Sequence, residues 1–273
     1  MKNRSETIGI ECLALSPEGR AKTTRQLICE EPLLITVGAT AVATLMCTPG
    51  DELALTLGFL YTEGIIRSAK EVGAMAFCPE ASGNVVRVIP AEGIDLSSRL
   101  TGFRTVFSSC SICGDEAIHA VASGLQPFAK SAGRLSPRAI FELAALMNQN
   151  QRFFKGTGGT HAAMLGRIHG GRLDPASAII KEDIGRHNAL DKVVGEALHT
   201  KAPLEESLLF LSGRMSFEMV SKAARAGISD LAAVSAPTAL AVQLAGRLGM
   251  FLAGFVRGET LVVYSGAEAL TIG

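Results

Sequence analysis

The stretch LLFLSGRMSF, residues 208–217, decides the fold, because four apolar residues in it are followed by a short polar turn. An apolar run of this length, ended by serine and glycine, is typical of a buried strand. The spacing of apolar residues over 217–226 predicts a helix directly after the turn. A strand joined to a helix in this way is the repeating unit of an α/β sheet.

The same order continues on both sides of this unit. Strands are expected over 162–168, 177–181, 231–235 and 260–264, and helices over 186–199 and 239–250. A further helix opens with Ser136 as its cap and Pro137 in its first position, and runs to about Gln151. Alternating strands and helices predict a largely parallel sheet with helices on both faces. The hairpin formed by the first two strands makes the sheet mixed.

The first hundred residues read as strands around one helix. Strands are expected over 27–37, 41–47, 74–77 and 84–89, a helix over 51–66, and a linker over 90–100. We therefore predict two domains. Residues 1–103 form a smaller N-terminal α+β domain, and residues 104–273 form a three-layer α/β domain with a mixed sheet.

Charge and hydropathy narrow the class of protein. Lys and Arg total 26, as do Asp and Glu, so no net charge attracts nucleic acid or an anionic membrane. The most apolar stretch, residues 231–256, is interrupted by Pro237, Gln243 and Arg247, which indicates buried elements rather than a membrane span. The first residues lack the apolar region of a signal peptide. We expect a cytoplasmic protein, in which disulfides are rare.

Two thiols, Cys110 and Cys113, lie three positions apart after a strand-like run and two serines. Such a pair on a loop can carry sulfur, cycle through a disulfide or form half of a metal site. The second half of a zinc site is missing, and thioredoxin-like motifs normally follow the first strand of a βαβ unit. A sulfur-carrying thiol is therefore favoured. The isolated cysteines are expected to be small buried hydrophobes; they are Cys12, Cys29, Cys47 and Cys78.

Polar motifs follow three of the predicted strands. They are EDIGRHN at 182–188, SGRMS at 212–216 and SAPT at 235–238. Because sites gather at the carboxyl ends of strands, these segments predict an anion-binding rim. Free N–H groups at the helix starts, together with Arg186 and Arg214, suit phosphates. For His187, capping of the helix and binding of a ligand are equally good interpretations.

Other polar residues favour structural roles. The GTGGTH segment at 156–161 matches neither phosphate-binding glycine motif, which indicates a tight turn, and His161 alone is more often structural. Asp191 and Lys192 are expected to form a solvated pair on a helix.

Together these segments resemble a known family, the formate dehydrogenase accessory sulfurtransferases, or FdhD family. The resemblance runs from about Glu31 to the end of the chain and is carried by SSCSICG at 108–114, GTGGTH, EDIGRHNALDK at 182–192, SGR at 212–214 and SAPT. It implies a second domain with the cytidine deaminase fold, and a homodimer. The zinc deaminases use a His-x-Glu motif and a Pro-Cys-x-x-Cys motif. This chain has no His-x-Glu and has Ser109 in place of the proline, so neither zinc nor deamination is expected.

The resemblance also implies a function. A cysteine desulfurase supplies sulfur, which Cys110 carries as a persulfide with Cys113 as relay or resolving thiol. The acceptor is the molybdenum bis(molybdopterin guanine dinucleotide) cofactor, which formate dehydrogenase needs in its sulfurated form. The resemblance also implies a nucleotide-binding segment, which comprises Phe255, Val256, Arg257, Gly258, Glu259 and Thr260. Without the resemblance, an ordinary turn entering a strand is the plainer interpretation of this segment. Four residues are further candidates from their strand-end positions: Arg186, His187, Gly213 and Arg214.

Two other classes of function remain open on the sequence. One is a chaperone that shelters the cofactor and docks on the apo-dehydrogenase without covalent chemistry. The other is a zinc protein with a nucleotide-like pocket, related to the deaminases. Loss of function on removing the cysteines separates the first from a sulfurtransferase, and metal content separates the second.

Overall fold

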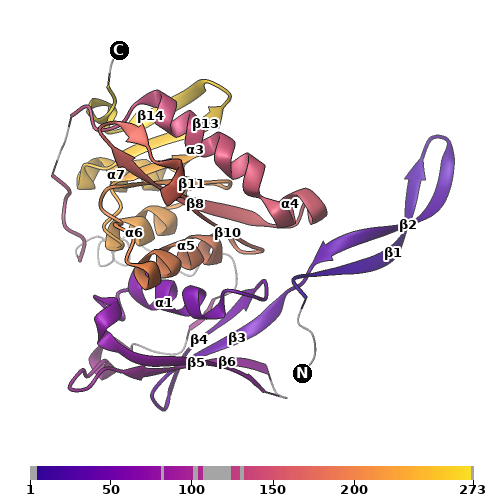
Figure 1. Cartoon of the computed structure of the whole chain (residues 1–273), viewed down its shortest axis with the longest axis horizontal. Coiled ribbons are helices and arrows are strands. Elements are labelled where there is room, and N and C mark those ends of the chain that lie inside the picture. The colour runs from indigo at the N-terminus through magenta and orange to yellow at the C-terminus, as the bar shows by residue number, and fades with distance from the viewer. Residues whose placement is uncertain (1–4, 81–82, 101–103, 107–123, 130–131, 272–273) are drawn as a thin grey trace.

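The structure is a computed structural model that describes residues 5–80, 83–100, 104–106, 124–129 and 132–271. Cys110 and Cys113 lie outside the described residues. Within the described part the elements stack in layers, from the N-terminal sheet through α1 and α5 to a second sheet and α3 (Figure 1). A two-stranded arm projects sideways from this stack.

The first sheet has five strands in the order β5-β6-β3-β4-β7, covered on one face by α1. Its strands are β3 (Glu31–Val37), β4 (Thr40–Cys47), β5 (Val72–Glu80), β6 (Gly83–Pro90) and β7 (Arg104–Val106), and α1 spans Glu52–Thr62. Alternate residues of β3, namely Leu33, Ile35 and Val37, are buried in the core that α1 closes. The predicted strands and helix of this region are confirmed, with shifted ends.

The arm was not predicted. It consists of β1 (Thr7–Ser16) and β2 (Gly19–Ile28), which pair only with each other. The predicted strand over 27–37 is wrong at its start, because residues 27 and 28 end β2 and a new strand begins at Glu31. Neither arm strand has a buried face, so the burial that produces a clear alternation in β3 does not act on them.

The second sheet has the order β10-β8-β11-β12-β13-β14, with the short β9 paired to β8. Its strands are β8 (His161–His169), β9 (Arg172–Leu173), β10 (Ile179–Asp183), β11 (Ser207–Leu211), β12 (Asp230–Ala233), β13 (Phe251–Arg257) and β14 (Thr260–Ser265). Only two pairs of neighbouring strands in this sheet are parallel, β11 with β12 and β12 with β13. The sheet is therefore mixed, as expected, but the prediction that it is largely parallel is wrong.

Strand β13 was missed. The helix predicted over 239–250 ends at Leu248, where Gly249 adopts the left-handed conformation that commonly terminates helices. The apolar run that follows, Phe251–Arg257, is a strand, and no element was predicted there. This strand adds one parallel pairing to the sheet and carries the first residues of the implied nucleotide-binding segment.

Helices cover both faces of the second sheet. On one face lie α5 (Arg186–Thr200), α6 (Phe217–Arg225) and α7 (Ala239–Leu248), and on the other lies α3 (Pro137–Asn150). Leu209 and Leu211 of β11 face the first group of helices, whereas Leu208 and Phe210 face α3. A strand buried on both faces reads as a continuous apolar run, which is why this segment decides the fold.

Helices α1 and α5 join the two sheets at a close crossing. A Cβ atom added to Gly58 would lie 1.8 Å from the carbonyl oxygen of Asp191, and one added to Gly195 would lie 1.8 Å from that of Ala54. Only glycine allows the backbones to approach so closely. The division at residue 103 remains a prediction; β7, beyond it, pairs with β4 in the first sheet.

The remaining short elements are α4 (Arg152–Thr157) and single 3-10 turns at Ala69–Glu71, Ser97–Arg99, Pro175–Ser177 and Ala267–Ala269. Among the helices of the described residues, none is both long and apolar enough to span a membrane.

Candidate functional site

Polar loops gather at one edge of the second sheet. Strands β10, β11, β12 and β13 all run toward this edge, and β8 begins there because His161 pairs with Asp183 at the end of β10. The predicted strand-end residues Arg186, His187, Gly213 and Arg214 therefore lie close together. His161, interpreted from the sequence as structural, joins them. We name His161, Arg186, His187, Gly213 and Arg214 the strand-end cluster.

Gly213 lets the cluster close up. A Cβ atom at this position would lie 3.1 Å from Nδ1 of His161 and 3.8 Å from Cβ of Arg186. A contact of 3.1 Å is tighter than ordinary van der Waals packing, so a larger side chain would push the imidazole away. The glycine thus holds the His161 ring against the loop that presents Arg214.

The cluster concentrates positive charge. Burial lowers the pKa of His161 below its ordinary value, and the neighbouring Arg186, Arg214 and His187 side chains lower it further. Burial and Arg214 likewise lower the pKa of Arg186. Cations that depress one another's pKa values in this way create a potential that favours an anion.

Three side-chain atoms at this edge are buried without a hydrogen-bond partner: Nε of Arg186, Nε2 of His187 and Oγ of Ser216. Only one other atom of this kind, Oγ1 of Thr56, occurs in the described part of the chain. Buried polar atoms are nearly always hydrogen-bonded, so an unpartnered set at one place indicates a site for a bound group. An acceptor-rich anion such as a phosphate supplies what these donors lack.

Glu218 sits beside His187. Its Oε2 lies 3.0 Å from Nε2 of His187, an ion-pair distance without hydrogen-bond alignment. His187 holds the pKa of Glu218 below its ordinary value, so the carboxylate of Glu218 stays charged. His187 does not cap α5, whose N-cap is Gly185.

The implied nucleotide-binding segment lies along the same edge. It comprises the end of β13, a hairpin turn at Gly258 and Glu259, and the start of β14, so it is a turn that enters a strand, and its role in binding a nucleotide remains a prediction. Phe255 is exposed with a φ of 51°, and its N–H donates to the carbonyl oxygen of Ser235 at 3.3 Å. The SAPT loop contacts both this segment and the SGRMS loop, because Ser235 accepts the hydrogen bond from Phe255 and Pro237 forms a β-bridge with Met215, next to Arg214.

Asp191 and Lys192, expected to be solvated, are both buried. Nζ of Lys192 lies 2.8 Å from Oδ2 of Asp183, and Asp191 accepts hydrogen bonds from Lys222 at 2.9 Å and Thr62 at 2.7 Å. The sequence does not reveal this, because the burial comes from α1 packing on α5. The same pairing ties the first sheet to the second, since Thr62 ends α1.

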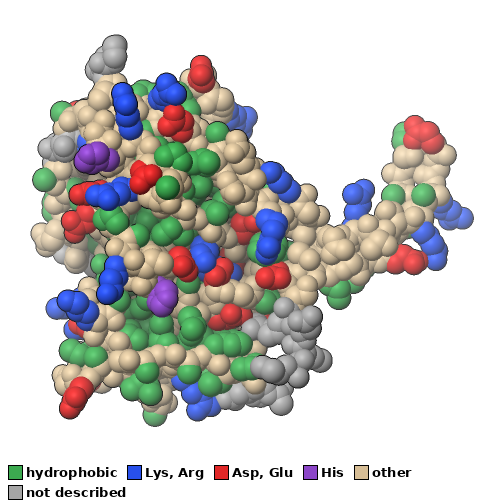
Figure 2. All heavy atoms as spheres, in the orientation of Figure 1, with side chains coloured by type: hydrophobic (Ala, Val, Ile, Leu, Met, Phe, Trp, Pro, Cys, Tyr) green, Lys and Arg blue, Asp and Glu red, His purple; other side chains and the backbone are tan. Residues whose placement is uncertain are grey.

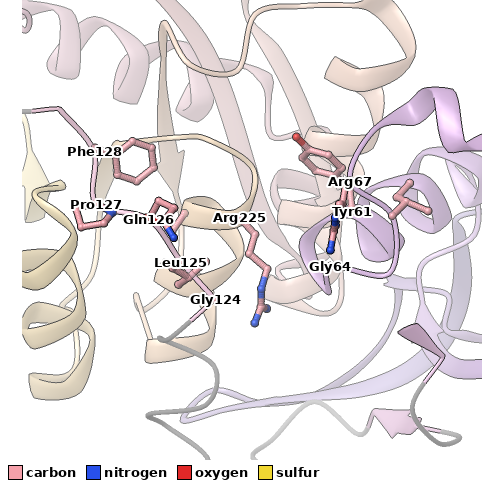
Figure 3. A pocket seen from close by; sticks show the side chains of 11 residues that line it. Tyr61, Gly64, Arg67, Gly124, Leu125, Gln126, Pro127, Phe128 and Arg225 are labelled. Carbon is pink, nitrogen blue, oxygen red and sulfur yellow. The ribbon is translucent and has the colours of Figure 1, made fainter. Parts of the chain in front are cut away.

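A cavity of about 480 Å³ lies at the seam between the two halves (Figure 3). Tyr61, Arg67 and Arg225 face the chain of Leu125 and Phe128 across it. Tyr61 lies in the last turn of α1, and Arg225 ends α6. The cavity is therefore lined by helix ends and lies away from the strand-end cluster. It is therefore a separate feature of the fold.

Cys47 is buried, as predicted, whereas Cys12, Cys29 and Cys78 are partly exposed, so that prediction is wrong for them. Among the described residues no group of three or more His, Cys, Asp and Glu side chains is placed to hold a metal ion. His161 and Glu218 were not predicted as site residues, and Ser216 was predicted only as part of the SGRMS motif at 212–216.

Mixed sheets, helices on both faces of the second sheet and a cluster of cationic side chains at one sheet edge define an α/β protein with a positively charged candidate site. The FdhD/NarQ family matches residues 28–271 of this chain. The sulfur carrier protein FdhD of Streptomyces coelicolor is 40% identical over 90% of this chain and 89% of its own. The sulfur carrier protein FdhD of Sulfolobus acidocaldarius is 38% identical over 93% and 94%. The chain belongs to the FdhD/NarQ family.

A solved structure has the same fold. The crystal structure of a proposed formate dehydrogenase accessory protein from Desulfotalea psychrophila matches with a TM-score of 0.77 and 24% identity, over 98% of this chain and 100% of that one.

Proposed function

We propose that this chain is a cytoplasmic sulfurtransferase that matures formate dehydrogenase. Cys110 accepts sulfur from a cysteine desulfurase as a persulfide, and Cys113 serves as relay or resolving thiol. The sulfur then passes to the molybdenum bis(molybdopterin guanine dinucleotide) cofactor, which the protein binds as acceptor. Membership of a family whose relatives are named sulfur carrier proteins supports the sulfur-transfer part of this role.

The observation that carries the acceptor half of the proposal is the set of unpartnered donors in the strand-end cluster. The cofactor bears pyrophosphate groups, and phosphate oxygens accept hydrogen bonds readily from guanidinium and imidazolium groups. Arg186, His187 and Ser216 offer such donors from buried positions, and Arg214 adds an exposed cation. These residues fit phosphates. On the same edge, the exposed ring of Phe255 offers a surface on which a guanine can stack.

The chemistry of the thiol is a simple exchange. The thiolate of Cys110 attacks the outer sulfur of the desulfurase persulfide, a new S–S bond forms, and the desulfurase thiolate leaves. The persulfide places the transferable sulfur one bond beyond the Cys110 thiol, which suits delivery to a metal centre. When bound, the molybdenum centre supplies the acceptor for that sulfur.

The described chain before the cysteines leads toward the strand-end edge. Val106, the last residue of β7, pairs with Leu45 of β4. The two strands are parallel, and β4 ends two residues later at Cys47. The next residue, Thr48, donates its N–H to Asp183 at 3.0 Å, where α5 is about to begin. Three residues separate Val106 from Cys110 in the sequence. This connection supports a thiol that meets its acceptor at the cluster.

The proposal includes a cytidine deaminase-like second domain that has lost the zinc chemistry, and a homodimer. A deaminase-like fold is compatible with the mixed sheet and its two layers of helices. The partners are the cysteine desulfurase and formate dehydrogenase.

The test is reactivation of sulfur-free formate dehydrogenase by the purified chain, a cysteine desulfurase and cysteine. We expect Cys110→Ala to abolish activation and Cys113→Ala to reduce it. The matched control is Cys78→Ala, a cysteine on β5 of the first sheet. Full activation by Cys110→Ala would refute the assignment of the carrier thiol.

A second candidate is a chaperone that binds the cofactor without covalent chemistry. The unpartnered donors favour it, because they lie on described elements and require no cysteine to bind an anion. The two functions separate in one variant: a chaperone predicts that Cys110→Ala still binds GDP and still activates the dehydrogenase, whereas a sulfurtransferase predicts binding without activation.

A further inference from the structure

The arm of β1 and β2 stands clear of the rest of the molecule (Figures 1 and 2). Its base is anchored, because the N–H of Cys29 donates to the carbonyl oxygen of Glu6 at 2.7 Å and Ile28 packs against Gly159. Beyond the base, Leu15 is 76% exposed and Ile8 is 53% exposed. A two-stranded ribbon is marginally stable alone in water, and three or more strands are needed for independent stability.

The two edges of the arm differ in charge. Strand β2 carries three cations, Arg20, Lys22 and Arg25, and α4 packs against it. Strand β1 carries a single charge, Glu11, among apolar and small residues. Natural sheets protect exposed edges with charged residues, especially lysine, against pairing with another chain. The edge of β2 has this protection and the edge of β1 lacks it.

We propose that β1 pairs in antiparallel fashion with β1 of a second copy of this chain, so that two arms form one four-stranded sheet. An antiparallel pair of identical strands is twofold symmetric, so the contact closes as a dimer. Pairing through β2 would place three cations of each copy beside three of the other. This proposal deepens the homodimer included in the proposed function and is independent of sulfur transfer.

Symmetry limits the register. Side chains directly opposite each other share a face of the sheet, so the axis passes through a residue that faces its own copy. Near the middle of Thr7–Ser16, the axis therefore passes through Glu11 or Cys12. Glu11 would set two carboxylates opposite each other, which is unfavourable. Cys12 sets two thiols opposite each other and places Ile10 against Ala14 of the second copy.

The experiment compares two double variants by light scattering after size exclusion under reducing conditions. Cys12→Lys with Ala14→Lys adds cations to β1, and we expect the dimer dissociation constant to rise at least about tenfold. The control, Thr23→Lys with Ala21→Lys, adds the same cations to the positions of β2 that pair with Cys12 and Ala14. We expect this control to dimerise like the unmodified chain.

A cross-link gives a second measurement on the unmodified protein. Directly opposed Cβ atoms lie close to the separation found in disulfides. Mild oxidation with copper phenanthroline should join Cys12 to Cys12 of the second copy, identified by peptide mass, and Cys12→Ser should prevent it. A monomeric unmodified chain, in which no such link forms, would overturn both the arm pairing and the homodimer. A dimer that persists in Cys12→Lys with Ala14→Lys, together with an unmodified dimer in which no Cys12–Cys12 link forms, would overturn the arm pairing alone.

Discussion

Helix α5 carries two sets of charged side chains that differ in how completely their polar atoms are hydrogen-bonded. At its start, Arg186 and His187 belong to the strand-end cluster, where buried donor atoms lack hydrogen-bond partners. Further along, Asp191 and Lys192 are buried in complete networks with Lys222, Thr62 and Asp183. The hydrogen-bonded charges of Asp191 and Lys192 join the first sheet with α1 to the second sheet, and the donor atoms without hydrogen-bond partners at the start of α5 are available to a ligand.

Removing a paired cation should have the largest effect. Lys222 contacts Asp191 and Glu63, and although its burial acts to lower its pKa, these carboxylates together raise it. Lys222→Met leaves Asp191 buried without its charge partner, which should lower the free energy of unfolding by about 3–5 kcal/mol. Urea unfolding measures this. Arg214→Met, which removes an exposed cation of the strand-end cluster, should change stability by less than about 0.5 kcal/mol; equal losses would erase the distinction.

The close crossing of α1 and α5 offers the next test. Gly195→Ala puts a methyl group against the backbone of Ala54, so we expect a loss of about 3 kcal/mol, at the upper end of overpacking effects. Thermal or urea unfolding measures it. Gly156→Ala is the matched control, since a Cβ atom there meets nothing within 4 Å. A tolerated Gly195→Ala would mean that the helices do not pack this closely.

The donor atoms without hydrogen-bond partners at the start of α5 should contribute to ligand binding. Arg186→Met removes a charged donor to phosphate and should weaken GDP binding by about tenfold or more, measured by calorimetry. Stability should be unchanged or higher, because a cation repelled by Arg214 is gone. Arg138→Met, on the exposed surface of α3, should leave GDP affinity unchanged. Unchanged affinity in Arg186→Met would remove this residue from the binding site.

The smallest expected effect concerns pH. The pKa of His161 in the folded protein lies below its unfolded value of about 6.5. As pH falls below that value, the unfolded state takes up the proton first, so folded stability declines until the folded pKa is passed. His161→Gln should flatten this part of the pH dependence in urea unfolding. An unchanged slope would show that His161 titrates normally in the fold.

The comparison also shows what the sequence could reveal. Arg186 and Arg214 were predicted to lie near each other because both follow strands that run to the same edge of the sheet. His161 was missed because it is the first residue of β8, which runs antiparallel to its neighbours. The rule that sites gather where strands end does not single out a residue at which a strand begins. Lys192 and Asp191 were misjudged because their burial depends on α1, more than a hundred residues away in the sequence.

Other errors have local causes. β11 was recognised because burial on both faces makes it continuously apolar, whereas no element was predicted over β13, which begins directly after the predicted helix over 239–250. The arm has no buried face and therefore no pattern that a core would impose. Regions that fold around their own core were predicted well, and regions that depend on distant contacts or have no buried face were not.

The most direct test of the central claim is the mass of the protein after incubation with a cysteine desulfurase and cysteine. The account predicts one added sulfur on the peptide that contains Cys110 and Cys113, removable by a reductant and absent in Cys110→Ala. A protein that gains no sulfur under these conditions, with an active desulfurase, would contradict the carrier role and leave the cofactor-binding chaperone as the better account.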